Sequence, residues 1–423
     1  MKKLIALFLA AILVLAAVPA LGEVVIQYPT FQVGVNTAAP VIARLVKEFN
    51  ENHAGEIRIV VEEIPGDANY IEKMKILMSS NDLPPVVYGA GYNLLDLALA
   101  SEQGVVDLTD AVNADPEWLA LYNDKSIEVN SRDGRIYASS SEGNTIGYFY
   151  NKELFAQAGL EGPAKTWDEF FDQCDKLLAA GITPLSMDTA DSAWVTSLWL
   201  GAMVATASDA GYEFMNTMMP DDYTIPEFVS AVEKVQIMFQ KYTTLDAVGG
   251  KYENAANAFM TGQTAMIANG PWMIGDFSDP TMAMEGFDQK VGCAIYPDNF
   301  AYDEPIQGYF VTKQKDPAVE AAAIEMVKFF TSAYAQTVAL ELQGMLPAAP
   351  TVQITDAAKK QFPLLAEFVT VLEGASIRSA NTQSTMYPNL LDVVSQELPN
   401  LAFGSMTPLE FCQKLTEAAA RNK

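Results

Sequence analysis

The 423-residue sequence contains one histidine and three cysteines. Zinc sites in proteins draw their ligands mainly from these two residue types, and the chain has neither a Cys-x-x-Cys pair nor a second histidine. We therefore expect no metal ion. The odd count leaves at least one cysteine unpaired. Cys174, Cys293 and Cys412 lie in segments with ordinary helix or strand patterns, so buried free thiols are the simplest interpretation, and one disulfide stays open.

Positive charge is scarce as well. The chain has 26 Lys and Arg against 53 Asp and Glu, which gives a formal net charge of −27. A chain with this balance repels phosphate backbones, so we expect no nucleic-acid partner. The acidic residues are scattered along the sequence rather than run together, which is typical of a solvated acidic surface.

Long apolar runs are absent except near the N-terminus. Residues 4–18 are apolar and follow two lysines, and Ala20 and Gly22 are small residues at positions −3 and −1 of a cut after Gly22. This order predicts a secretory signal peptide, residues 1–22, because the run is shorter than the roughly 20 residues that span a bilayer. Since Glu23 rather than a cysteine follows the expected cleavage site, we expect no lipid anchor. The predicted mature chain is soluble and extracytoplasmic, either periplasmic or secreted.

The rest of the chain alternates between two kinds of pattern. Short apolar or β-branched segments predict strands at residues 24–27, 57–64 and 86–88. Apolar residues at helical spacing predict helices at residues 41–49, 70–79 and 94–101. Such alternation favours an α/β architecture with a mostly parallel sheet and helices on both of its faces.

The length of the chain bears on its division into lobes. About 400 residues exceed what one hydrophobic core usually holds, so two lobes are expected. No Pro- or Ser-rich linker divides the sequence. We therefore expect the chain to cross between the lobes more than once, with residues 136–144 and 305–312 as the candidate crossings.

Three threonine-led segments mark expected helix starts. Residues 166–169, 224–227 and 407–410 share the Thr-x-x-Glu spacing of a capping box. In this motif the Thr hydroxyl and the Glu carboxylate accept hydrogen bonds from free N–H groups at the start of a helix. These signals predict structure and carry no function.

Motifs for catalysis are missing from the sequence. No GxSxG elbow surrounds a serine, and no GxxxxGK[ST] loop is present to hold a nucleotide. A glycosidase would need two carboxylates about 5 to 10 Å apart, and nothing singles out such a pair among the acidic residues. A secreted carbohydrate hydrolase with paired carboxylates stays open as the alternative to a binding protein. A structural or adhesive protein would show repeats, and none is apparent.

Three stretches of sequence carry a family resemblance. Residues 143–155 read GNTIGYFYNKELF, residues 258–272 read AFMTGQTAMIANGPW, and residues 344–348 read GMLPA. In this order and spacing they resemble the family 1 extracellular solute-binding proteins of ABC importers, the group that includes maltose-binding proteins. One departure is Pro85, where the family usually has an aspartate, and the strand that follows is unaffected.

This resemblance implies a two-lobe periplasmic-binding-protein fold of type II, with a ligand cleft between α/β lobes that several hinge crossings join. It implies an N-lobe of residues 23–142 plus 306–350 and a C-lobe of residues 143–305 plus 351–423. It further implies a monomeric binding protein without enzyme activity or cofactor. Such a protein captures a mono- or oligosaccharide by lobe closure and delivers it to the permease of an ABC transporter.

Sugar recognition needs two kinds of side chain. Flat aromatic rings cover the apolar C–H faces of a pyranose, and planar polar groups bond its hydroxyls. Trp272 is the strongest candidate because it follows Asn269, Gly270 and Pro271 at a turn, and in similar proteins this tryptophan stacks on sugar. The candidates on or just after loops that follow strands are Trp194, Tyr92, Asp188 and Gln32, and those at the crossings are Asn144, Glu142 and Tyr309. The last candidate is Arg378, an isolated cation in residues 374–380.

Each candidate has a plainer alternative. For the aromatic residues the alternative is packing in the core, and for the polar residues it is a solvated position in a loop or at the hinge. For Arg378 it is an ion pair at the surface. The resemblance implies an aromatic ring near Trp194 and a ligand-bonding polar group near Glu142 and Asn144.

Overall fold

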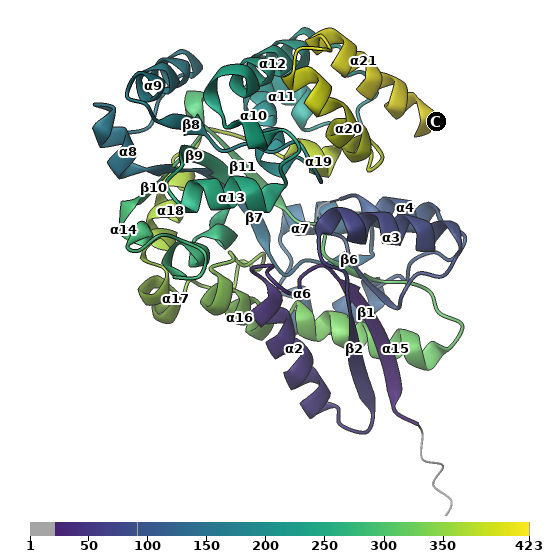
Figure 1. Ribbon diagram of the computed structural model, residues 1–423. Helices are drawn as coiled ribbons and strands as arrows, with labels where there is room; N and C mark the ends of the chain where they lie inside the picture. The colour runs from purple at the N-terminus through teal and green to yellow at the C-terminus, as the bar shows by residue number, and fades with distance from the viewer. Residues whose placement is uncertain (1–21, 91, 423) are drawn as a thin grey trace, which may run out of the picture.

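The computed structural model describes residues 22–90 and 92–422, so the expected signal peptide, apart from its last residue, lies outside the described residues. The chain forms two bodies, one above the other in Figure 1. The lower body is called the first lobe here because the chain enters it first, and the upper body is called the second lobe. Within the described ranges, every helix is too short or too polar to cross a membrane.

Among the described residues, the first lobe contains three small sheets. β1 (Val24–Thr30) pairs in parallel with β2 (Ile57–Glu63). β12 (Tyr309–Val311) lies between β3 (Val86–Tyr88) and β6 (Ala138–Ser139), and β4 (Ser131–Arg132) pairs with β5 (Arg135–Ile136). The helices of this lobe are α2 (Ala39–Asn52), α3 (Asp67–Ser79), α4 (Leu94–Ala100), α5 (Thr109–Asn113), α6 (Pro116–Leu119), α7 (Asp124–Asn130), α15 (Pro317–Phe330) and α16 (Ala333–Gln343).

The second lobe contains one larger sheet. Its strand order is β13-β11-β7-β9-β8, with β10 paired to β7 as well. The strands are β7 (Gly143–Asn151), β8 (Thr183–Leu185), β9 (Thr264–Asn269), β10 (Val291–Ala294), β11 (Phe300–Pro305) and β13 (Ile377–Ser379). The helices are α8 (Lys152–Gln157), α9 (Trp167–Ala179), α10 (Trp194–Ala205), α11 (Asp209–Met215), α12 (Pro226–Ile237), α13 (Tyr252–Met260), α14 (Phe287–Lys290), α17 (Asp356–Gln361), α18 (Pro363–Glu373), α19 (Thr382–Thr385), α20 (Leu390–Ala402) and α21 (Pro408–Ala419).

The direction of the strands corrects one prediction. The expectation of a mostly parallel sheet is wrong, because β7 is antiparallel to β9, β10 and β11, and β12 is antiparallel to β3 and β6. The chain enters the second lobe along β7 and leaves it along β11, and it leaves the first lobe along β6 and returns along β12. Since the entering and leaving strands are neighbours in each lobe, they must run in opposite directions.

In the part of the chain that the structure describes, three segments cross between the lobes. Residues 140–142 join β6 to β7 and residues 306–308 join β11 to β12, which confirms crossings within the two predicted stretches. A third crossing, residues 344–349, follows α16. Hydrogen bonds link the first crossing to the second and the start of β7 to the third. Ser140 Oγ donates to the Ile306 carbonyl at 2.6 Å, and the Gly143 amide donates to the Leu346 carbonyl at 3.0 Å.

Gly308, in the second crossing, lies against the backbone where β6 passes into the first crossing. A Cβ atom on Gly308 would lie 1.8 Å from the carbonyl oxygen of Ser139 and 2.2 Å from its carbonyl carbon. Only a residue without a side chain allows the two backbones this separation. The amide of Gly89 donates to the Gly308 carbonyl at 3.0 Å, so this crossing also fixes the loop after β3.

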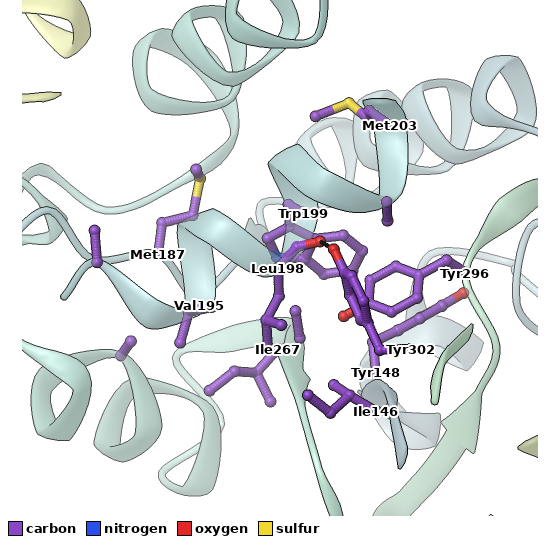
Figure 2. Packing of buried hydrophobic residues seen from close by; sticks show 14 of the residues in the cluster. Ile146, Tyr148, Met187, Val195, Leu198, Trp199, Met203, Ile267, Tyr296 and Tyr302 are labelled. Carbon is purple, nitrogen blue, oxygen red and sulfur yellow. Dashed lines mark hydrogen bonds between the residues drawn. The ribbon is translucent and has the colours of Figure 1, made fainter. Parts of the chain in front are cut away.

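Several aromatic residues pack together among aliphatic side chains in the core of the second lobe (Figure 2). The Trp199 ring on α10 lies 5.3 Å from the ring of Tyr148 and 5.3 Å from that of Tyr296. The Tyr302 hydroxyl donates to the Leu198 carbonyl at 2.6 Å, which satisfies a polar group that would otherwise be buried without a partner. α10 therefore has a fixed position in the lobe, and its first residue is Trp194.

All three cysteines are buried and free. Cys174 lies on α9, Cys293 on β10 and Cys412 on α21. The interpretation of the sequence as carrying buried free thiols is thus confirmed, and the disulfide left open is absent.

Candidate functional site

The first group of candidate residues lies where the first two crossings meet β1 and β3. The Tyr88 hydroxyl donates to the carboxylate of Glu142. The Tyr88 and Tyr309 rings are stacked, with 4.7 Å between their centroids, and the Tyr309 hydroxyl approaches Gln32 Oε1 at 3.5 Å. Gln32, Glu142 and Tyr309 are distant in sequence, so the fold brings three predicted site residues together. We call Gln32, Tyr88, Glu142 and Tyr309 the hinge cluster.

Glu142 has an unusual environment for a carboxyl group. Its exposed fraction is only 8%, and burial raises the pKa of its carboxyl to about 7. Water stabilises the charged form of a carboxyl group, so its removal favours the neutral form. Near neutral pH, Glu142 therefore carries a proton in a large fraction of molecules and can either donate or accept a hydrogen bond.

This burial leads to a prediction about stability and pH. The folded-state pKa lies above the ordinary value of 4.5. Between pH 4.5 and pH 7, the folded chain therefore keeps a proton that the unfolded chain has already lost. The stabilisation is fully present below pH 4.5 and has been lost once the pH has risen past 7, and the total loss is about 3 kcal/mol. Glu142→Gln stays neutral and can still accept from Tyr88.

We expect the free energy of unfolding of Glu142→Gln to exceed that of the wild type by about 3 kcal/mol at pH 8 and to match it at pH 4. Urea unfolding at both pH values measures this difference. The measurement at pH 4 is the internal control, because both side chains are then neutral. An equal offset at pH 4 and pH 8 would contradict the assignment of a buried, proton-retaining Glu142.

A second group joins the lobes through a carboxylate. Tyr92, at the loop after β3, donates its hydroxyl to Asp67 Oδ2 at 2.7 Å. Ser192, on the opposite lobe, donates to the same oxygen at 3.4 Å. Asp67 begins α3 and is half-buried. It is thus an acceptor at the junction of the lobes, next to a predicted site residue.

The aromatic pair Trp194 and Trp272 belongs to the second lobe. Their ring centroids are 5.9 Å apart with planes tilted by 52°, and both side chains are half-buried. Asn269 Oδ1 lies 3.4 Å from the Trp194 indole nitrogen, and Asn269 Nδ2 donates to the Tyr252 hydroxyl at 2.9 Å. A Cβ on Gly270 would lie 2.1 Å from the Trp272 ring. The tryptophan therefore lies against its own turn.

Both tryptophans lie close to the other lobe or to a crossing. The turn that carries Trp272 contacts the third crossing, since a Cβ on Gly344 would lie 3.5 Å from the Pro271 carbonyl oxygen. Trp194 follows Ser192, which bonds to Asp67 of the first lobe. The half-exposed rings are thus placed at the junction of the lobes, where they could cover one face of a pyranose.

The remaining candidates are placed differently. Asp188 is fully buried and caps α10, where its carboxylate accepts from the Thr196 amide at 3.0 Å and the Val195 amide at 3.3 Å. Arg378 forms an ion pair with Asp303 at 3.1 Å, which is the alternative expected for it. Asn144 lies in β7, and its side chain lies outside the described residues. The ligand contacts of all nine candidates stay predictions.

Sequence reasoning missed Asp67 and Tyr88. Gly66-Asp67 follows the end of β2, so a polar residue after a strand was visible in the sequence. Tyr88 is the last residue of a predicted strand, and its hydroxyl extends beyond the apolar run. Neither signal identifies the partner, because the partners of these residues come from distant parts of the chain.

No group of three or more His, Cys, Asp or Glu side chains able to hold a metal ion occurs among residues 22–90 and 92–422. A void of about 20 Å³ lies inside the second lobe, between α10, α12, α20 and α21. That volume accommodates about one water molecule. The void is therefore separate from the candidate site and too small for a saccharide.

A sequence model of one protein family, described as bacterial extracellular solute-binding protein, matches residues 44–365. The chain belongs to the bacterial extracellular solute-binding proteins. The resemblance seen in the three sequence stretches is thereby confirmed.

Two curated relatives show what this solute-binding protein is similar to. The multiple sugar-binding protein of Streptococcus mutans is 23% identical over 263 residues, which cover 60% of this chain and 59% of that protein. The sn-glycerol-3-phosphate-binding periplasmic protein UgpB of Brucella abortus is 22% identical over 288 residues, which cover 63% of this chain and 61% of that protein. The matches thus span about three fifths of each relative's length.

Solved structures confirm the fold class of this solute-binding protein. A chitin oligosaccharide binding protein superposes with a TM-score of 0.80 at 22% identity, over 94% of this chain and 98% of that one. A Streptococcus pneumoniae solute-binding protein in complex with the blood group A-trisaccharide gives 0.79 at 21% identity, over 93% and 99%. The predicted two-lobe fold of type II periplasmic binding proteins is confirmed.

Proposed function

We propose that this solute-binding protein captures a mono- or oligosaccharide outside the cytoplasm and delivers it, as a monomer, to the permease of an ABC transporter. The observation that carries this proposal is the pair of half-exposed rings, Trp194 and Trp272, at the junction of two lobes. The sugar-binding names of several relatives support it. We further propose residues 23–142 with 306–350 and residues 143–305 with 351–423 as the two lobes, on the basis of sheet membership.

The proposed mechanism divides recognition between the lobes. The two tryptophan rings of the second lobe cover the apolar face of a sugar ring. Polar groups of the first lobe and the hinge, Gln32, Asp67 and Glu142, bond its hydroxyls. Because only the closed arrangement offers both kinds of group at once, the sugar shifts the population of the protein toward closure. The permease would then recognise the closed form.

A screen of mono- and oligosaccharides by thermal unfolding tests this proposal. A sugar that binds only the folded chain at one hundred times its Kd should add about 2.7 kcal/mol to the free energy of unfolding. We expect at least one neutral saccharide to do so. If none does while glycerol 3-phosphate or a polyol stabilises the protein, it binds solutes but the assignment to sugars is wrong.

The hydrolase alternative is tested on the same samples. Glu142 has the raised pKa that a general acid in a glycosidase would need, so each stabilising oligosaccharide is incubated with the protein and analysed by chromatography. We expect the saccharide to be recovered intact. Shorter products in proportion to the protein added would overturn the proposal that the protein is not an enzyme.

A further inference from the structure

One short turn of the first lobe, residues 92–95, contacts both the second lobe and the hinge. Asn93 Nδ2 donates to the Ser384 carbonyl at 2.6 Å and to the Met386 carbonyl at 3.1 Å, both in the second lobe. The backbone amide of Leu95 donates to Gln307 Oε1 at 3.0 Å, in the second crossing. The same four residues therefore contact both the opposite lobe and the hinge.

The side chain of Asn93 is suited to this position. Its exposed fraction is 3%, and its backbone has a φ of 53°, in the left-handed region. Asparagine tolerates that conformation better than most residues. Because both of its partners are carbonyl oxygens, the amide must direct its NH₂ group at them, and the orientation of the side chain is fixed by chemistry.

Lys75 adds a second contact one helix away. Its ammonium group donates to the Pro388 carbonyl at 3.3 Å and to Asp392 Oδ2 at 3.2 Å. Lys75 lies on α3, and Asp392 lies in the first turn of α20. The side chain of Asp392 is 56% exposed, so salt weakens this ion pair. The side chain of Asn93 is uncharged and buried, so salt does not weaken its carbonyl contacts in this way.

The surface that receives these contacts is itself fixed to the second lobe. Asn381 caps α19 by accepting from the amides of Gln383 at 2.8 Å and Ser384 at 3.1 Å. Gln383 Nε2 donates to the Ser192 carbonyl at 2.5 Å, and Ser192 lies two residues before Trp194. The segment 384–392 is therefore joined to the part of the second lobe that carries the candidate aromatic residues.

We propose that Asn93 and Lys75 form a latch with the carbonyl oxygens and the Asp392 carboxylate that they contact. The latch stabilises the closed arrangement of the lobes and so changes the affinity for every ligand by the same factor. This inference rests on the proposed binding between the lobes. The latch uses only protein groups, so it adds the same free energy to the closed state whichever sugar is bound. The apparent Kd equals the Kd of the closed state divided by its population, so a change in that population multiplies all Kd values alike.

Variants that keep the turn intact test the latch. Asn93→Gly removes the amide while allowing the left-handed backbone, and Asn93→Asp places a carboxylate against two carbonyl oxygens. Asn81→Gly is the matched control, because Asn81 also has a positive φ, of 55°, and its side chain bonds to Glu102 of its own lobe. Thermal unfolding of each variant without sugar verifies that it folds.

The first measurement is affinity, with maltotriose and N-acetylchitotriose as probes. We expect Asn93→Gly to weaken both by the same factor, about fivefold to tenfold, and Asn93→Asp to weaken both further. Asn81→Gly should change neither. A loss confined to one probe would overturn the latch, because it would mean that Asn93 contacts that sugar directly.

The second measurement does not depend on any ligand. Small-angle scattering without sugar should show a larger radius of gyration for Asn93→Asp than for the wild type and Asn81→Gly. If no saccharide of the screen, these two probes included, binds the wild type while this difference is observed, the sugar assignment fails and the latch stands. If the radius is the same in all three proteins, the latch is wrong.

Discussion

Substitution of Gly308 by alanine is expected to lower the free energy of unfolding by about 3 kcal/mol. The new Cβ would lie 1.8 Å from the Ser139 carbonyl oxygen, and the nearest atoms all belong to the backbone of Ser139 and Ser140. A flexible side chain could move away, but these backbone atoms are bonded into β6 and the first crossing. The two crossings must therefore separate, at the expense of the bond from Gly89 to the Gly308 carbonyl.

Urea unfolding measures this loss, and Gly162→Ala provides the control. A Cβ on Gly162 has no other atom within 4 Å, and its backbone is outside the left-handed region, so its stability should stay within about 0.5 kcal/mol of the wild type. Wild-type stability in Gly308→Ala would contradict the close approach of the crossings. Because these crossings are the hinge, the variant should also show a changed radius of gyration by small-angle scattering.

Replacement of Trp272 by alanine is expected to weaken sugar binding by about 2 kcal/mol, or roughly thirtyfold. The ring is half-buried and lies beside Trp194, so a sugar that covers its free face would complete the removal of the indole from water. Loss of the ring removes this contribution and also leaves Trp194 without its neighbour. Isothermal titration with the tightest-binding saccharide of the screen measures the change.

Trp167→Phe is the control for this experiment. Trp167 begins α9, packs against Phe170 and donates its indole N–H to Thr206 at 2.8 Å, away from the junction of the lobes. The variant should lose about 1 kcal/mol of stability and bind sugar as the wild type does. Unchanged affinity in Trp272→Ala would remove Trp272 from the proposed site.

The helix starts show what sequence can and cannot establish locally. At Thr407 the full capping box forms, with Glu410 accepting from the Thr407 amide. At Thr224 the prediction is wrong, because its hydroxyl bonds to Asp222 and Glu227 accepts from Ser208 instead. Asp222 is only two residues from Thr224, and Ser208 is the N-cap residue of the preceding helix, α11. These two nearby side chains took the place of the partners that the capping box predicts.

The candidate site shows the same limit at longer range. The positions of Gln32, Glu142 and Tyr309 at strand ends and crossings could be inferred from sequence, and the fold brings them together. The role of Asp188 could not be inferred from sequence, because a carboxylate between a strand and a helix can either face a ligand or cap that helix. The structure shows it capping α10.

The three free cysteines give the protein a practical property. Burial raises the pKa of the Cys293 and Cys412 thiols to about 12 and that of Cys174 further still, so almost no thiolate is present at neutral pH. Maleimide dyes should therefore leave the native thiols unlabelled. Cysteines introduced at Val35 in the first lobe and Leu245 in the second, whose side chains are 82% and 95% exposed, would carry a fluorophore pair. Energy transfer between the two dyes would then follow the opening and closing of a single molecule in real time, with every native cysteine left in place.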